Sequence, residues 1–336
     1  MAFRRCLAAV TTVAAVIERR FTARPLRRKD VYPQAVLDGR IARRGPGTGT
    51  AGATASRVSR LLTSRGERDE AELEARLHEA GSVTRPNTVA VISPKGGVGK
   101  TSCTYLIGSL LASRKRLRVL AVDVNPDFGT LASLVPEAAR SPHDAADLYQ
   151  ALEDVPTSAA VRSYVTALPS GLHILAAPER PEVMAAMTPQ RYGILLVFLA
   201  QFYDLILLDM GTGVVDPLAR LGISRADHVL VVTDQEYATA NRVLGALRHL
   251  DAPAEAEPTA PLERLTVVLN KMPSSGDRVS VREAFRKAGV RRQVVVPHDA
   301  QLATMLDSSS YALEGLRRAT RMAIREMGLV VAQRLV

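Results

Sequence analysis

The sequence predicts an α/β protein with a doubly wound, mostly parallel sheet of seven to eight strands, helices on both faces and a basic N-terminal extension. Three observations lead to this fold class. After Pro86, short runs rich in β-branched residues alternate with stretches of helical periodicity. Several runs are continuously apolar, which is typical of strands covered on both faces. The chain of 336 residues is 47% hydrophobic, which is enough to bury such a sheet.

The predicted strands are short apolar runs, and the predicted helices fill the intervals between them. We expect strands at Thr88–Ser93, Arg118–Val122, Leu172–Ala176, Leu205–Asp209, His228–Thr233, Leu265–Asn270 and Gln293–Val296. We expect helices at Lys100–Ser113, Pro142–Ala151, Pro189–Phe202, Tyr237–Leu250, Val281–Ala288 and Tyr311–Arg334. This alternation favours parallel strands joined by helical crossovers.

The last predicted helix has one apolar face and a set of arginines to one side of it. The apolar positions are Leu313, Leu316, Ile324, Met327 and Val331, and the arginines are Arg318, Arg321 and Arg325. Such a helix can cover the sheet or lie on a membrane surface. We favour the sheet-covering role, because the apolar face lacks the Phe and Trp of interfacial anchors.

The net charge of +10 is concentrated at the N-terminus. Residues 1–44 hold eleven Lys and Arg against three acidic residues, residues 45–86 are neutral, and residues 87–336 carry only +2. We therefore predict three parts: a flexible basic arm (1–44), a Gly-rich linker with a charged helix at Arg57–Ala80 (45–86), and the α/β domain (87–336).

The basic arm contains a twelve-residue apolar stretch, Cys6–Ile17, flanked by arginine pairs. It is too short to span a bilayer as a helix. A signal peptide, an organellar transit peptide and an amphipathic helix on anionic lipid remain alternatives to a flexible tail or an overextended start. The two cysteines, Cys6 and Cys103, form no metal-ligand spacing and favour a reducing compartment.

A glycine-rich loop follows the first predicted strand of the α/β domain. It reads Lys95-Gly96-Gly97-Val98-Gly99-Lys100-Thr101 and leads into a helix that continues with Ser102. Glycines let backbone N–H groups turn around a polyphosphate, and the helix N-terminus adds positive potential. In such loops the final lysine reaches the β- and γ-phosphates and the hydroxyl ligates Mg²⁺. The sequence therefore predicts a site for ATP and Mg²⁺.

This loop resembles the deviant Walker A motif of the MinD/ParA ATPases, and the D-x-N-P-D-x-G-T segment at residues 123–130 resembles that of actinobacterial MinD-like ATPases. The resemblance covers roughly residues 86–310. It implies an ATP-dependent homodimer in which Lys95 of one subunit contacts the nucleotide of the other. It also implies that Lys95 and Lys100 act in catalysis and that residues 95–102 bind the nucleotide.

The segment after the second predicted strand resembles the family's switch I. Asp123 matches its first aspartate, but Asn125 stands where the second aspartate usually orients the attacking water. An amide can orient water but is a very poor base, and Asp127 can supply the missing carboxylate. We read the segment as a subfamily variant, and the alternative is a protein that binds ATP without hydrolysing it.

Two further strand ends match the family. Leu205–Asp209 has the Walker B form, so Asp209 is expected to hold Mg²⁺ through a water, while Thr101 ligates it directly. Asn270 and Pro297 match positions beside the nucleotide base, and Pro273 replaces the aspartate that a guanine reader would need. The resemblance therefore implies ATP rather than GTP.

We expect a slowly hydrolysing ATPase switch that positions or regulates a larger assembly, such as partition, division, pilus or secretion machinery. The alternatives are a nucleotide-dependent, non-specific DNA-binding partition protein and a pseudo-ATPase adaptor. The basic arm suits DNA phosphates or anionic lipid, but it lacks interleaved aromatic residues. The expected location is the cytoplasm, at the periphery of the membrane or the nucleoid, with a protein partner that the sequence does not identify.

Overall fold

The computed structural model describes residues 65–125, 129–213, 216–234, 236–251, 262–273 and 278–335. The chain divides into two compact units, Met1–Asp69 and Glu70–Val336, and the sheet lies in the second. The basic arm, the Gly-rich linker and the first part of the predicted charged helix lie outside the described residues. The predicted three-part division therefore stays a prediction.

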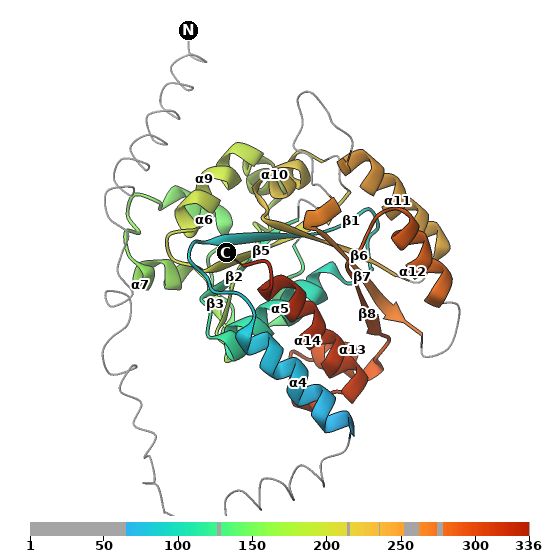
Figure 1. Cartoon of the computed structure of the whole chain (residues 1–336). Helices are drawn as coiled ribbons and strands as arrows, with labels where there is room; N and C mark the ends of the chain where they lie inside the picture. The colour runs from blue at the N-terminus through green and yellow to red at the C-terminus, as the bar shows by residue number, and fades with distance from the viewer. Residues whose placement is uncertain are drawn as a thin grey trace, which may run out of the picture. The chain divides into compact units, whose positions relative to one another are not determined.

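A single sheet of eight strands runs in the order β3-β4-β2-β5-β1-β6-β7-β8 (Figure 1). The strands are β1 (Asn87–Ser93), β2 (Val119–Val124), β3 (Thr166–Ala167), β4 (Leu172–Leu175), β5 (Leu205–Thr212), β6 (His228–Thr233), β7 (Leu265–Met272) and β8 (Gln293–Pro297). All neighbours pair in parallel except β3, which is antiparallel to β4. The predicted fold class is confirmed, and the two-residue β3 is the strand that the sequence did not reveal.

Helices cover both faces of the sheet (Figure 1). They are α4 (Arg65–Glu79), α5 (Lys100–Lys115), α6 (Ala145–Gln150), α7 (Ser158–Val161), α8 (Pro181–Ala186), α9 (Pro189–Leu199), α10 (Pro217–Arg225), α11 (Tyr237–Asp251), α12 (Arg278–Lys287), α13 (Ala300–Asp307) and α14 (Arg318–Ala332). Of these, α7, α8, α10 and α13 were not predicted from the sequence. They are only four to nine residues long, which is too short for helical periodicity to stand out in the sequence.

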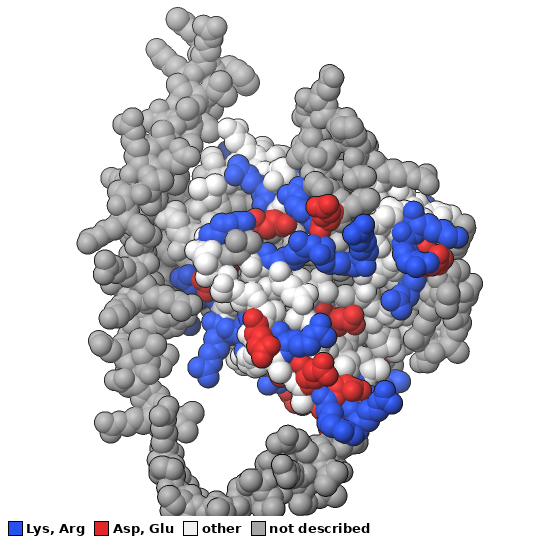
Figure 2. Space-filling view, in the orientation of Figure 1, with Lys and Arg blue, Asp and Glu red and all other residues white. Residues whose placement is uncertain are grey.

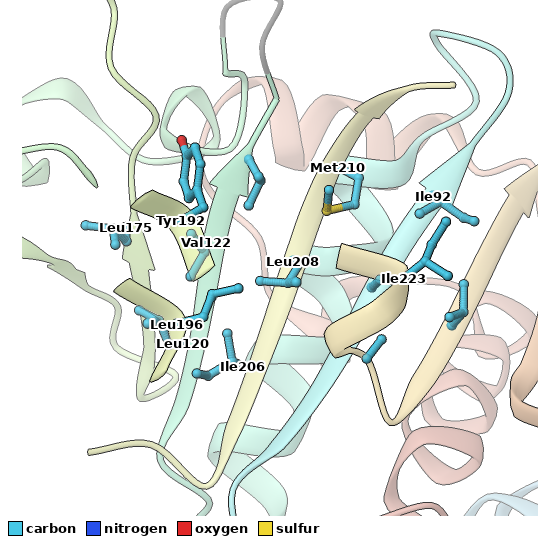
Figure 3. Packing of buried hydrophobic residues seen from close by; sticks show 14 of the residues in the cluster. Ile92, Leu120, Val122, Leu175, Tyr192, Leu196, Ile206, Leu208, Met210 and Ile223 are labelled. Carbon is cyan, nitrogen blue, oxygen red and sulfur yellow. The ribbon is translucent and has the colours of Figure 1, made fainter. Parts of the chain in front are cut away.

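The strands divide their side chains between two buried clusters, one on each face. In β1, Ala90 and Ile92 join the cluster under α9, α10 and α11, while Val89 and Val91 join the cluster under α5 and α14. Successive residues of a strand point to opposite faces, so a continuous apolar run supplies both clusters. Figure 3 shows the first cluster, in which Leu120, Leu208 and Ile92 come from the adjacent strands β2, β5 and β1, and helical residues such as Leu196 and Ile223 pack over the sheet.

The C-terminal segment differs from its predicted form. Instead of one helix over Tyr311–Arg334, a 3₁₀ turn (Leu313–Gly315) precedes α14. Leu316 and Arg317 have extended backbone, and this break lets both Leu313 and Leu316 enter the core. The apolar face of α14 packs against α5 and β8, which confirms the sheet-covering interpretation. Among the described residues, no helix is both long and apolar enough to cross a bilayer.

The arginine side of α14 meets residues 70–79 of α4. Arg321 forms a forked pair with Glu70 at 2.7 and 2.9 Å. Arg325 reaches Glu70 at 2.7 Å and Glu74 at 2.6 Å, and its side chain is only 8% exposed. On the face seen in Figure 2, acidic and basic side chains lie interspersed over α4 and its neighbours. This ion-pair network, with Leu73 and Leu77 buried beside it, holds the helix on the domain.

Replacing Arg325 with methionine is expected to destabilise the protein by about 3 kcal/mol, because Glu70 and Glu74 would lose their buried partner. Urea unfolding of wild type and variant measures the loss. The same change at Arg286, whose exposed side chain pairs with Glu283 on one helix, should leave stability nearly unchanged, because water screens this pair. Equal losses at the two sites would show that burial of the network does not matter.

The network also predicts a pH dependence. The hydrogen bond from Arg321, followed by the charges of Arg325 and Arg321, lowers the pKa of Glu70. Its contribution to stability is therefore present above the ordinary pKa of a glutamate and lost as the pH falls through the lowered value.

Candidate functional site

The glycine-rich loop joins the end of β1 to the start of α5. Gly97 (φ 74°) and Gly99 (φ 94°) have left-handed backbone, which other residues adopt only with strain. Gly99 is the N-cap of α5, and no side-chain hydrogen bond caps this helix in the described structure. The N-terminal N–H groups of α5 and the positive end of its dipole therefore face the loop, as in anion-binding sites.

Two side chains from the end of β7 hold the loop from behind. Asn270 Nδ2 donates a hydrogen bond to the Val98 carbonyl at 2.8 Å, and Lys271 Nζ donates to the Gly97 carbonyl at 2.7 Å. A Cβ atom on Gly99 would lie 2.3 Å from Asn270 Nδ2, so only glycine fits there. In this structure the amide group of Asn270, which we predicted to contact a base, binds the loop backbone.

Lys100 is almost entirely buried, with 9% of its surface exposed. Burial lowers the pKa of its ammonium, and the nearby charge of Asp209 partly opposes this effect. Its neighbour Thr101 places its hydroxyl 3.0 Å from that of Thr130, which lies beyond the end of β2. The first turn of α5 thus brings an ammonium and a hydroxyl to the carboxyl ends of the strands.

Asp123 and Asp209 stand side by side, in register on the adjacent strands β2 and β5. They are 1% and 2% exposed. Burial raises the pKa of both carboxyls, and for Asp209 the charge of Asp123 adds to the rise. Hydrogen bonds from Thr101 and Thr104 and the charge of Lys100 oppose the rise at Asp209. Two buried carboxylates near a single buried ammonium leave a local excess of negative charge when both are ionised.

The loop after β2 closes over Asp123. Asp123 Oδ1 accepts a hydrogen bond from the Asn125 N–H at 3.1 Å, and Asp123 Oδ2 accepts one from the Leu131 N–H at 2.9 Å. A Cβ atom on Gly129 would lie 2.4 Å from Oδ2, so the chain passes the carboxylate at close range. Asn125 is partly buried directly after β2. Asp127 lies outside the described residues.

The paired carboxylates and the threonine hydroxyls are ligands of the kind that Mg²⁺ prefers. The excess negative charge gives a cation a physical reason to bind, because it would offset the burial that raises the pKa of both carboxyls and the repulsion by Asp123 that adds to the rise at Asp209. Among the described residues, no group of three or more His, Cys, Asp or Glu side chains gathers as a metal cluster. The residues therefore fit an ion bound by few protein groups together with water and phosphate oxygens.

Lys95 lies against two acidic residues of its own chain. Its Nζ is 3.0 Å from Asp234 Oδ2 and 2.6 Å from Glu236 Oε2. The hydrogen bond with Glu236 and then that with Asp234 raise the pKa of the ammonium, which stays protonated at neutral pH. No motif in the sequence singles out these acids. Asp234 follows β6 directly and Glu236 lies two residues further on. Both are therefore at the carboxyl ends of the parallel strands, where ligand-binding residues gather.

The remaining predicted residues lie at the same edge of the sheet or beside it. Gly96 lies next to Thr212 at the end of β5, and Ser102 is half-buried in the first turn of α5. Pro297 ends β8, opposite Met272 of β7. Asp299, two residues further on, has a structural role, since it caps α13 and accepts a hydrogen bond from Thr320 at 2.6 Å.

Comparison with known families agrees with this architecture. Residues 89–310 match the family described as the CobQ/CobB/MinD/ParA nucleotide binding domain. The chain is also 30% identical, over 219 residues, to the ESX-1 secretion-associated protein EspI of Mycobacterium tuberculosis. That alignment covers 64% of this chain and 32% of EspI, so the chain spans about a third of its relative.

Solved structures share the fold at low sequence identity. A ParA family ATPase from Chlorobium tepidum superposes with a TM-score of 0.61 at 22% identity, over 71% of this chain and 97% of that one. The cell division ATPase MinD of Pyrococcus furiosus gives a TM-score of 0.58 at 17% identity, over 73% and 98% of the chains. MinD of Pyrococcus horikoshii, solved with Mg-ADP, gives 0.55 at 20% identity over 72% and 94%. At these identities the likeness establishes the fold.

Proposed function

Because the chain belongs to the CobQ/CobB/MinD/ParA nucleotide binding domain family, we propose that it is an ATP-driven dimerisation switch that hydrolyses ATP slowly and regulates a larger assembly. One observation carries the proposal. The glycine loop, the buried Lys100 and the two buried carboxylates Asp123 and Asp209 converge on one edge of the sheet. This set provides N–H donors, an ammonium and cation ligands, which are the groups that a metal-bound triphosphate requires.

Each residue has a distinct role in this proposal. The backbone of residues 96–102 and the ammonium of Lys100 bind the phosphates. Thr101 and Asp209 hold Mg²⁺, which when bound neutralises phosphate charge. Asp123 holds the loop that carries Asn125, and Asn125 or Asp127 orients water for hydrolysis. Support for this role comes from the two hydrogen bonds that Asp123 accepts from backbone N–H groups of that loop.

The nucleotide base is proposed to lie between the ends of β7 and β8, near Asn270 and Pro297. In that position Asn270 has two options. It can keep its hydrogen bond to the Val98 carbonyl and offer its other amide atoms to the base, or it can leave the Val98 carbonyl and bind the base instead. Pro273 occupies the position where a guanine reader carries an aspartate, which favours adenine. Competition between ATP and GTP for the protein tests this preference.

The two acids beside Lys95 give the switch a resting position. If Lys95 is to reach a nucleotide in a second subunit, it must first leave Asp234 and Glu236. The two acceptors and the phosphates of the partner's ATP would then compete for one ammonium. We propose that the acids hold Lys95 in the separate subunit and release it when the dimer closes.

Two sets of changes should shift dimerisation in opposite directions. Lys95→Ala should leave ATP affinity largely intact but suppress the ATP-dependent dimer and its turnover, because the cross-subunit ammonium is gone. The double variant Asp234→Asn, Glu236→Gln should dimerise in ATP at several-fold lower protein concentration, because the resting contacts are weakened. Light scattering in ATP and in ADP measures both, and wild-type dimerisation of Lys95→Ala would rule out the cross-subunit role.

The larger assembly is proposed to be secretion machinery. The EspI relative is described as ESX-1 secretion-associated, and it aligns with this chain over 219 residues. We propose that the ATP-bound dimer is the form that a secretion component binds. Capture of such a component by the protein in ATP, with loss in ADP, is the expected result.

A second candidate is ATP-dependent DNA binding, which the excess positive charge of residues 1–44 favours. Retention on non-specific DNA that requires ATP and weakens steeply with salt would support it. The adaptor alternative follows from Asn125. Phosphate release distinguishes it, because an adaptor would bind Mg·ATP and show no turnover in either wild type or Asp127→Ala.

A further inference from the structure

Lys271 has a left-handed backbone conformation at an irregularity in β7. Among the described residues, three non-glycine residues have positive φ: Arg116 (53°), Lys271 (55°) and Ser309 (52°). Arg116 ends α5 and Ser309 follows the end of α13, where left-handed residues are common. Lys271 instead lies inside β7, where the pairing with β8 shifts register between Leu269 and Met272. The irregularity accounts for the left-handed backbone, which a lysine adopts at a small cost that glycine would not incur.

Lys271 directs its side chain to the glycine loop. Lys271 Nζ binds the Gly97 carbonyl, and the adjacent Asn270 binds the next carbonyl, that of Val98. Two successive carbonyls of the loop are thus held toward β7. In a trans peptide the N–H points opposite to the C=O. The N–H groups of Val98 and Gly99 therefore point away from β7.

The contacts of Asn270 and Lys271 with the loop differ in how much each residue contributes to folding. Asn270 is buried, at 8% exposure, and packs on Gly99, so it also supports the core. The Lys271 side chain is exposed and contributes little to packing. Its described contact is the ammonium on the carbonyl, and a positive charge there polarises the peptide and makes its N–H a stronger donor. The role of Lys271 is thus separable from folding.

We propose that Lys271 is a positioning residue, which holds Gly97 and Val98 so that the N–H groups of the loop are oriented for phosphate before a nucleotide arrives. The inference rests on the proposed function, because it assigns a task to Lys271 in the same nucleotide site. It predicts that Lys271 contributes to affinity for ADP and ATP alike, since both carry the phosphates that the loop surrounds. Turnover at saturation should change little, because the contact is the same before and during reaction.

Glycine at position 271 separates positioning from structural support. Lys271→Gly removes the ammonium but accepts the positive φ without strain, so the variant should unfold at the same temperature as wild type or higher. Its affinity for Mg·ADP and Mg·ATP, measured by calorimetry, should fall about tenfold. Lys271→Arg keeps a cationic donor and should recover most of that loss. Ser309→Gly relieves a similar backbone just past the end of α13, at a residue with no described contact to the loop, and should leave affinity unchanged.

The outcomes are distinguishable. If wild type binds Mg·ATP and Lys271→Gly binds it equally well, the positioning role is wrong while the proposed function stands. If affinity and unfolding temperature fall together in Lys271→Gly, the residue is structural and the inference is overturned. If wild type binds neither nucleotide, both the proposed function and this inference fail.

Discussion

Replacing Lys100 with alanine is expected to abolish measurable binding of Mg·ATP, with a loss of at least about a hundredfold in affinity. Lys100 supplies a nearly buried ammonium at the start of α5, next to the glycine loop. Burial already disfavours its charge, as the lowered pKa shows, and phosphate oxygens would restore the lost solvation. Calorimetric titration with Mg·ATP measures the effect.

The control for this variant is Lys287→Ala, which removes an exposed lysine at the end of α12. It should bind as wild type does. Lys100→Ala should also fold, because the ammonium's neighbour Asp209 can take up a proton when the cation is gone. Retention of wild-type ATP affinity by a folded Lys100→Ala protein would contradict the assignment of the phosphate site.

Replacing Asp209 with asparagine is expected to have two effects of opposite sign. The nucleotide-free protein should become more stable by about 2 kcal/mol at pH 8, because a buried, poorly compensated charge next to Asp123 is removed. At the same time, the thermal stabilisation produced by ATP should no longer depend on Mg²⁺. Stability given up at one position in exchange for ion binding is typical of a functional site.

The raised pKa of Asp209 predicts the direction in which folding stability changes with pH. Burial, with the charge of Asp123, raises the pKa of Asp209 to about 7, so the folded state holds a proton that the unfolded state has released. The contribution of this group to stability therefore falls as the pH rises from about 4 to about 7. The advantage of Asp209→Asn over wild type should be largest at pH 8 and should disappear near pH 4.

Thermal unfolding across this pH range measures the difference, and Asp154→Asn at an exposed position is the control. A few degrees of stabilisation are expected at pH 8 for Asp209→Asn, and none for Asp154→Asn. If Asp209→Asn is less stable than wild type at pH 8, its carboxylate is well compensated in the fold and the proposed cation site loses its physical basis.

Much of the architecture follows from local patterns in the sequence. Seven of the strands, their mostly parallel direction and the glycine loop at the end of β1 were predictable. Each rests on a pattern within a few consecutive residues, either a continuous apolar run or a cluster of glycines. The positions of Lys100, Asp123 and Asp209 at one sheet edge follow from the rule for the carboxyl ends of parallel strands.

Other features depend on contacts that are distant in sequence. The break before α14 arises because Leu313 and Leu316 both reach the core, which periodicity along one helix cannot reveal. The ion pairs of Arg321 and Arg325 with Glu70 and Glu74 join residues about 250 positions apart. From the sequence alone, these charged residues look like solvent-exposed faces of two helices.

The contacts of the loop show the same limit at the candidate site. Sequence motifs gave Lys95 and Asn270 roles toward a nucleotide, yet in the structure both side chains bind their own chain. Motifs describe the state in which a ligand is present, whereas the fold also fixes where each side chain rests. The contacts of Lys95 with Asp234 and Glu236, and of Lys271 with the loop, became visible only in the structure, where β1, β6 and β7 lie side by side.

The most direct test of the account is a calorimetric titration of the full chain with Mg·ATP. We predict saturable binding of one nucleotide per chain, with affinity lost on chelation of Mg²⁺ and in Lys100→Ala. The account is contradicted if wild-type protein, shown to be folded by circular dichroism, takes up no Mg·ATP at millimolar concentration.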